Sequence, residues 1–260
     1  MPLRDTSSTC HCQRLKPGLL LLVTDDATQL AQAAADLVSE ALRNVPRSVL
    51  ALPTGRTSIG FYAALVAMHR RQAISLRFAT TFNLDEFVGL PASHPGTYRS
   101  FMRYHLFEHV DIEPGNAHVP DGEALDLAGE CDRYESMVAR AGGIDLAVLG
   151  IGENGHIGFN EPGSPLDSRT RVVDLAPASR RANAHLFERL SDVPSRAITM
   201  GIGTILEARR LILLANGSAK ADALHRALRG PVATSLPASA LQLHPNVVVI
   251  ADREASSKLL

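Results

Sequence analysis

Short apolar runs alternate with amphipathic stretches along most of this chain. Continuous apolar runs predict buried strands at residues 19–23, 48–52, 78–83, 145–150, 211–215 and 247–250. Between them, apolar residues at helical spacing predict helices over residues 27–42, 58–70, 97–107, 124–140 and 219–228. Strands that are apolar along their whole length, and that helices separate, are typical of a parallel sheet covered on both faces.

This alternation predicts an α/β fold with an open, mostly parallel twisted sheet and helices on both faces, a Rossmann-like three-layer arrangement. We expect residues 17–260 to form a single domain. Residues 1–16 are polar and have no apolar core, so we expect them to form a loose N-terminal extension. Ligands of such folds bind beyond the carboxyl ends of the strands. The residues that follow each strand are therefore the candidates for function.

The second strand is followed by Thr54, Gly55, Arg56 and Thr57, and then by a helix. A glycine and hydroxyl residues at a strand-to-helix turn present free backbone N–H groups, which suit a phosphate. The alternative is an ordinary helix cap, in which a hydroxyl satisfies the first turn. Taken alone, this turn favours the cap.

The third strand ends in two adjacent carboxylates, Asp85 and Glu86. A carboxylate just past a buried strand could act as a general base. Neighbouring side chains on an extended segment point to opposite sides, so we expect only one to face a cleft. The alternative is a solvated loop.

The fourth strand runs into a glycine-rich segment, residues 150–163, that contains His156 and Glu161. Glycines at 150, 152, 155 and 158 predict a tight backbone path with positive φ at some of them. A histidine in such a path, directly after a buried strand, is a candidate for proton transfer. Glu161 can pair with it if the segment folds back.

The fifth strand is followed by Lys220, one of only three lysines in the chain. The other two, Lys16 and Lys258, lie near the termini. Lys220 begins a helix, where the dipole disfavours a cation unless an anion lies nearby. A surface lysine with a packed stem is the alternative. Because all four polar clusters share one edge of the sheet, together they predict proton abstraction from a small phosphorylated substrate.

Composition narrows the function classes further. The net charge of −1 gives no general attraction to nucleic acid or to an anionic membrane. Three cysteines, Cys10, Cys12 and Cys131, are too few and too scattered for a disulfide framework, which favours a reducing compartment. The Cys10–Cys12 segment lacks a second Cys/His pair at zinc spacing, so we expect no metal. There is no secretory signal and no apolar run that could span a bilayer, so we expect a cytoplasmic protein.

These clusters also resemble the glucosamine-6-phosphate deaminase (isomerase) family, within a larger group that includes 6-phosphogluconolactonase. The resemblance covers about residues 18–254. Its most specific segments are Asn-Leu-Asp-Glu-Phe at 83–87 and Gly-His-Ile-Gly-Phe-Asn-Glu-Pro at 155–162. The lactonases look different at both places, with a Ser-Asp-Glu-Arg type segment and Gly-His-Thr-Ala-Ser.

The resemblance implies a reaction that turns an amino-sugar phosphate and water into a keto-sugar phosphate and ammonia, without a metal or an organic cofactor. Asp85 would take the proton from C2 and return it to C1. His156, oriented by Glu161, would move the proton that opens the pyranose ring. Backbone groups of the turn at 54–57 would bind the sugar phosphate, while Arg180 and Lys220 supply positive charge.

The sequence departs from some relatives at several positions, of which three bear most on function. Asn154 stands where several members carry an aspartate that tunes the histidine, so the pH profile should differ. Arg56 replaces a turn glycine and could crowd the loop or add a phosphate contact. Arg171 matches an effector-binding residue of hexameric members, but the lysine expected two positions later is Val173. Allosteric regulation and a hexamer therefore do not follow from the sequence, and a homo-oligomer of another size stays open.

Three alternatives to glucosamine 6-phosphate deamination remain. Galactosamine 6-phosphate is one, since contacts to C4 cannot be identified in the sequence. A lactonase-type hydrolase on the same fold needs no carbon base, and the segments around Asp85 and Phe159 speak against it. A sugar-phosphate sensor would need a DNA-binding module, and residues 1–16 are too short for a helix-turn-helix.

Overall fold

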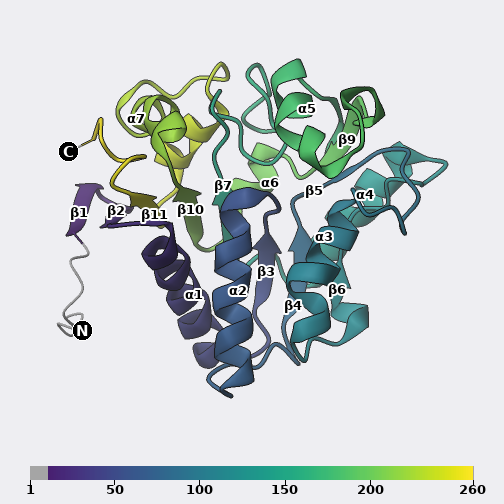
Figure 1. The fold of residues 1–260 in the computed structure, drawn as a ribbon, viewed down its shortest axis with the longest axis horizontal. Helices are drawn as coiled ribbons and strands as arrows, with labels where there is room; N and C mark the ends of the chain where they lie inside the picture. The colour runs from purple at the N-terminus through teal and green to yellow at the C-terminus, as the bar shows by residue number, and fades with distance from the viewer. Residues whose placement is uncertain (1–10, 260) are drawn as a thin grey trace.

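An eight-stranded sheet forms the centre of the protein (Figure 1), and the computed structural model describes residues 11–259. The strand order is β1-β2-β11-β10-β7-β3-β4-β6. All neighbouring strands are parallel except β1, which runs antiparallel to β2. The strands are β1 (His11–Lys16), β2 (Leu19–Thr24), β3 (Val49–Leu52), β4 (Thr80–Asn83), β6 (Ala117–His118), β7 (Leu146–Gly150), β10 (Leu211–Ala215) and β11 (Val247–Asp252).

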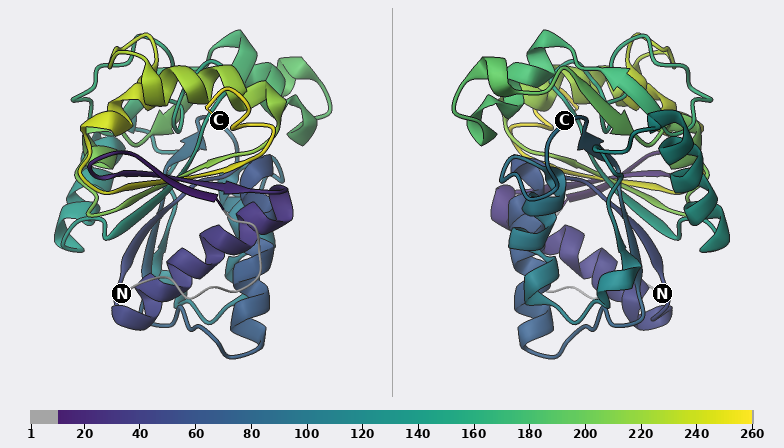
Figure 2. Two further views of the ribbon diagram at one scale, coloured as in Figure 1. Left: turned by 90° about the vertical axis from the view of Figure 1, so that its left-hand side faces the viewer. Right: turned by 90° about the vertical axis from the view of Figure 1, so that its right-hand side faces the viewer.

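Helices cover both faces of this sheet (Figures 1 and 2). One layer holds α1 (Ala27–Asn44), α2 (Arg56–Arg70) and α3 (Tyr98–His105), and the other holds α4 (Leu127–Arg140), α6 (Ile202–Leu206) and α7 (Ala221–Arg229). Successive residues of a strand face opposite layers: in β3, Leu50 and Leu52 pack with α1 and α2, while Val49 and Ala51 pack with the other layer. The predicted three-layer α/β fold is confirmed. Within residues 11–259, no helix has the length and apolar character needed to cross a membrane.

A second, three-stranded antiparallel sheet lies beyond the carboxyl ends of the central strands. Its order is β5-β9-β8, formed by β5 (Asp85–Phe87), β9 (Arg196–Thr199) and β8 (Arg171–Asp174). Helix α5 (Pro177–Asn183) follows β8 and lies at the top of Figure 1. A separate apolar cluster holds this part together: Phe87, Tyr98, Phe159, Leu175 and Ala197. Short 3₁₀ turns complete the chain: η1 (Phe107–His109), η2 (Pro114–Asn116), η3 (Ala184–Leu186), η4 (Leu190–Asp192), η5 (Ser218–Lys220) and η6 (Pro237–Leu243).

The predicted loose extension is wrong for residues 11–16. They form β1, which pairs with β2 from His11 opposite Val23 to Lys16 opposite Leu19. Lys16 Nζ also donates to the backbone oxygen of Gln242 at 2.8 Å. The segment looks like a loop in the sequence because an edge strand with a solvated face needs few apolar residues. Residues 1–10 of the predicted extension lie outside the described part of the chain.

Candidate active site

The candidate site lies where the strand order reverses, between β3 and β7. From β3 the chain continues to β4 on one side, whereas from β7 it reaches β10 on the other side. Ligands of open α/β sheets bind in the crevice at such a point, beyond the carboxyl ends of the strands. The segments that leave β3, β4, β7 and β10 there carry the four predicted polar clusters. The first and last clusters meet directly, since Thr57 Oγ1 donates to Asn216 Oδ1 at 2.6 Å.

Asp85 is the first residue of β5 and is only 5% exposed. Burial, and secondarily the nearby Glu86 carboxylate, raise the pKa of Asp85 to about 8. The glycine-rich segment runs against this carboxylate: a Cβ on Gly158, whose φ is +55°, would lie 3.3 Å from Asp85 Oδ2 and 3.0 Å from Thr199 Oγ1. A side chain at position 158 would therefore crowd the Asp85 carboxylate, which explains the glycine.

Glu86 has a structural task. Its Oε1 accepts from the N–H groups of Phe87 and Tyr98 at 2.8 and 2.9 Å, and its Oε2 accepts from the Arg99 N–H at 2.8 Å. The carboxylate thus satisfies the first turn of α3, where the helix dipole favours a negative charge. Burial raises the pKa of Glu86 even though these hydrogen bonds oppose the shift. Of the two adjacent carboxylates, Asp85 is the one available for chemistry.

His156 and Glu161 are brought together by the glycine-rich segment, as predicted. Glu161 Oε2 lies 3.6 Å from His156 Nδ1 and accepts from Asn154 Nδ2 at 2.7 Å. Glu161 Oε1 accepts from the Ser179 hydroxyl of α5. Burial alone would raise the pKa of Glu161, but its contacts with His156, Ser179 and Asn154 outweigh that effect and lower the pKa to about 2. Glu161 is therefore ionised at neutral pH and can orient the imidazole.

The glycines of this segment let the backbone wrap around the His156 ring. A Cβ on Gly152 would lie within 2.5 Å of three ring atoms of His156. The Gly152 N–H donates to the His156 oxygen at 2.9 Å, which closes the turn. The predicted positive φ is found at Gly155 (+84°) and Gly158 (+55°).

After β3, the N-terminus of α2 lies near two cationic side chains, Arg56 in the turn itself and Lys220 in η5. Gly55, at φ +102°, is the N-cap of α2 and supplies no side-chain hydrogen bond to the first turn. Burial lowers the pKa of the Lys220 ammonium; Glu153 acts in the opposite direction, and the nearby Arg56 guanidinium lowers it further. Two cations held close together beside a helix N-terminus are an arrangement that favours a bound anion.

Two predicted arginines have other contacts in this structure. The Arg180 guanidinium of α5 donates to the backbone oxygens of Val193 and Leu190, at 2.8 and 3.4 Å. Among the described contacts, none joins it to Arg56 or Lys220. Arg171 of β8 donates to Asn160 Oδ1 at 2.8 Å and to Ser164 Oγ at 3.0 Å, so it supports the glycine-rich segment.

Sequence reasoning gave no role to Tyr98, Ser179 or Asn183, all of which touch the site. The Tyr98 hydroxyl donates to Asn183 Oδ1 at 3.1 Å, and Ser179 binds the Glu161 carboxylate. The only available signal was their place in segments that resemble the deaminase family, at 94–98 and 179–183.

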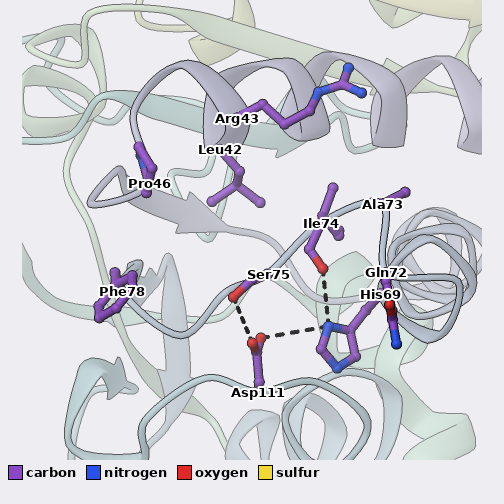
Figure 3. Close-up of a pocket in the computed structure, with 10 residues that line it drawn as sticks. All are labelled: Leu42, Arg43, Pro46, His69, Gln72, Ala73, Ile74, Ser75, Phe78 and Asp111. Atoms are coloured by element: carbon purple, nitrogen blue, oxygen red, sulfur yellow. Dashed lines mark hydrogen bonds and ion pairs between the residues drawn. The ribbon is translucent and has the colours of Figure 1, made fainter.

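A cavity of about 450 Å³ lies elsewhere, at the ends of α1 and α2 (Figure 3). Three of its polar side chains, those of His69, Ser75 and Asp111, contact one another or the nearby backbone. His69 Nδ1 lies 3.2 Å from the Ile74 oxygen and 3.6 Å from Asp111 Oδ1, and Asp111 accepts from the Ser75 hydroxyl at 2.6 Å. These contacts hold the turn between α2 and β4, and we assign this cavity no part in the reaction. It is lined by Leu42, Arg43, Pro46, His69, Gln72, Ala73, Ile74, Ser75, Phe78 and Asp111.

Known proteins share the sequence and the fold of this chain. The family model described as glucosamine-6-phosphate isomerases/6-phosphogluconolactonase matches residues 24–250. A relative from Geobacillus sp. (strain WCH70), named glucosamine-6-phosphate deaminase, is 48% identical over 229 residues, which are 88% of this chain and 91% of the relative. Another of the same name, from Rhodopirellula baltica, is 49% identical over 238 residues, which are 92% of this chain and 94% of the relative.

Solved structures extend the comparison. A structure described as a monomeric glucosamine-6-phosphate deaminase matches with a TM-score of 0.90 at 43% identity, over 92% of this chain and 99% of that chain. A 6-phosphogluconolactonase from Trypanosoma brucei matches with a TM-score of 0.76 at 20% identity, over 94% and 99% of the two chains, and shows the shared fold alone. The chain therefore belongs to the glucosamine-6-phosphate isomerase/6-phosphogluconolactonase family.

Proposed function

We propose that this protein is a glucosamine-6-phosphate deaminase, which converts D-glucosamine 6-phosphate and water to D-fructose 6-phosphate and ammonia. The observation that carries the proposal is a buried carboxylate, Asp85, which has no donor within residues 11–259. It lies at the same sheet edge as an imidazole beside an ionised carboxylate, His156 with Glu161. Lactone hydrolysis needs no carbon base, so this pairing favours deamination. The names of the relatives support the same choice.

Ring opening is the first step in this proposal. His156 takes the proton of the C1 hydroxyl and passes it to the ring oxygen, which gives the open-chain aldehyde. The negative charge of Glu161 stabilises the imidazolium that forms on the way. Asn154 donates to the same Glu161 oxygen that faces His156, so it fixes the carboxylate without adding a charge.

Carbon proton transfer follows, because the C–H at C2 becomes acidic only beside a free aldehyde. Asp85, as carboxylate, takes the C2 proton to give an enolamine and returns a proton to C1. The product is an imine at C2; water adds to it and ammonia leaves, which yields the ketose. A pKa near 8 suits a group that both accepts and returns a proton near neutral pH.

The substrate phosphate binds at the start of α2, near the backbone N–H groups of Gly55, Arg56 and Thr57. Thr54 borders this turn, and Arg56 and Lys220 compensate the phosphate charge. Arg180 reaches the phosphate in the bound state only if it leaves its contacts with Val193 and Leu190. We further propose a cytoplasmic enzyme, because three scattered cysteines in the sequence favour a reducing compartment.

The test is to incubate the purified protein with glucosamine 6-phosphate, galactosamine 6-phosphate or 6-phosphogluconolactone, and to measure ammonia, ketose phosphate and lactone loss. We expect ammonia and fructose 6-phosphate in equal amounts from the first substrate. Lactone hydrolysis without ammonia would overturn the proposal, and ammonia from galactosamine 6-phosphate alone would overturn the choice of sugar.

A substitution at Asp85 tests its proposed role as the base that takes the C2 proton. Asp85→Asn should lower kcat by about 10²–10⁴-fold, the usual contribution of a positioned general base. It should also stop exchange of the C2 proton with deuterated solvent while binding of inorganic phosphate persists. Exchange at the wild-type rate would exclude Asp85 as the base.

A further inference from the structure

A series of side-chain and backbone contacts leads from the proposed phosphate turn to Glu161, which faces the proposed catalytic histidine, His156. The Thr54 side chain, two residues beyond the end of β3, lies near enough to the Tyr98 hydroxyl to lower its pKa, against the larger effect of burial. That hydroxyl donates to Asn183 Oδ1 at 3.1 Å. Asn183 Nδ2 donates to the Ser179 backbone oxygen at 2.9 Å, one helical turn earlier in α5. These contacts connect the phosphate turn to α5.

The second half of this series leads from α5 to the imidazole. The Ser179 hydroxyl donates to Glu161 Oε1, and the other carboxylate oxygen faces His156 Nδ1 at 3.6 Å. That separation exceeds the length of a hydrogen bond, and Nδ1 is a buried atom without a hydrogen-bond partner among the described residues. A shift of a few tenths of an ångström in the Glu161 carboxylate would make the missing bond.

Tyr98 is the most firmly held residue in this series of contacts. Its side chain is 4% exposed, and its ring packs against Phe87 and Phe159 with centroids 4.8 and 5.8 Å away. Glu86 holds its backbone N–H. Burial raises the pKa of Tyr98 well above its ordinary range, and the nearby Asp85 acts in the same direction. The hydroxyl therefore keeps its proton and remains a donor to α5.

We propose that Tyr98 is a positioning residue that transmits phosphate binding at the turn of residues 54–57 to the Glu161–His156 pair. An anion near the backbone N–H groups of that turn moves or orders Thr54. Tyr98 passes the change to Asn183, and α5 carries Ser179 and the Glu161 carboxylate toward His156 Nδ1. The inference rests on the proposed function for the roles of the turn and of the pair. Catalytic hydrogen bonds that are long in the free enzyme and shorten on binding are common.

The test follows the His156 imidazole by ¹H–¹⁵N NMR during titration with inorganic phosphate, with the signal assigned through His156→Gln. In the wild type, phosphate should shift the Nδ1 signal as the bond to Glu161 forms. Tyr98→Phe and Asn183→Ala should still bind phosphate but lose this shift, and kcat with glucosamine 6-phosphate should fall about tenfold. Tyr104→Phe, an exposed tyrosine on the same helix, is the matched control and should behave as wild type.

The Asn183→Ala variant leaves the packing of the Tyr98 ring in place, so a lost shift in this variant reports the coupling between phosphate binding and His156 and not a folding defect. Unfolding temperatures are measured for all variants to check that each is folded. If phosphate shifts the His156 signal equally in the wild type, in Tyr98→Phe and in Asn183→Ala, the inference is overturned. Phosphate binding to the wild type without any shift at His156 would also overturn it. If the shift is present but no amino-sugar phosphate releases ammonia, the proposed function fails while the coupling stands.

Discussion

At the scale of single residues, two carboxylates at one sheet edge have opposite properties. Asp85 is buried without a donor among the described residues, and its pKa is raised to about 8. Glu161 is surrounded by donors, and its pKa is lowered to about 2. Environments that separate two pKa values in this way suit different tasks. In the proposed mechanism, Asp85 is a carbon base that accepts and returns a proton, and Glu161 is a permanent anion that orients an imidazole.

The raised pKa of Asp85 predicts a stability that falls with pH. In the unfolded chain this group ionises near 3.8, whereas in the folded protein it ionises near 8. The folded state therefore binds the extra proton between these values, and the stability present below pH 4 is lost as the pH rises toward 8. Asp85→Asn removes this loss. As the pH rises through this window, the unfolding free energy of Asp85→Asn should increase relative to that of the wild type by up to about 1.4 kcal/mol per pH unit.

Urea unfolding of both proteins at pH 5, 6.5 and 8.5 checks this prediction. Glu161→Gln is a control of opposite sign, since a lowered pKa stabilises the folded state above the unfolded value and that stability is lost as the pH falls toward 2. It should be less stable than the wild type at pH 6.5. A pH-independent difference between Asp85→Asn and wild type would show that Asp85 ionises normally.

At the scale of elements, the sequence predicted six central strands and five helices, because their apolar runs are continuous or follow a helical period: β2, β3, β4, β7, β10 and β11, and α1, α2, α3, α4 and α7. It missed the edge strands β1 and β6, the short helices α5 and α6, and the second sheet. Strands β5, β8 and β9 of that sheet are three or four residues long and include Asp85, Glu86, Arg171 and Asp174. A short strand with charged residues has no period that can be recognised. The site was predictable only as clusters at strand ends. The partners that fix it, such as Ser179 on α5, depend on the second sheet and its neighbours.

The end of α2 carries an unfavourable backbone conformation. Gln72 has φ +59°, the only positive φ at a non-glycine residue in the described part of the chain. Its N–H donates to the His69 oxygen, and the Ala73 N–H donates to the Met68 oxygen, which is the Schellman pattern that usually places glycine here. Gln72→Gly should therefore stabilise the protein by about 1 kcal/mol, a rise of about 2–4 °C in unfolding temperature.

The matched control for this substitution is Gln32→Gly, at an exposed position inside α1. There glycine should destabilise by about 1 kcal/mol, because it loses more backbone entropy in a helix. Calorimetry on the two variants compares the same chemical change in opposite backbone environments. Destabilisation by both would mean that the left-handed conformation at Gln72 is not a source of strain.

At the scale of the whole molecule, the site is assembled from segments that are distant along the chain, at residues 54–57, 85, 154–161, 179–183 and 220. The central sheet holds the strands that deliver these segments, and its far edge is closed by β1. β1 covers β2, whose residues are almost entirely apolar. An uncovered apolar edge strand can pair with strands of other molecules, so β1 protects β2 from such association. This edge of the sheet lies away from the candidate site at β3 and β7.

Deleting residues 1–16 should therefore lower the unfolding temperature and cause concentration-dependent association, measured by calorimetry and by size-exclusion chromatography with light scattering. The deletion removes the ladder from His11–Val23 to Lys16–Leu19 and the Lys16–Gln242 contact, and it turns β2 into the edge. A chain that begins at His11 retains β1 and serves as the control. We expect kcat/KM of the folded fraction to be unchanged in both, because the site lies at β3 and β7. Equal stability of the two truncated chains would mean that β1 adds nothing to the sheet.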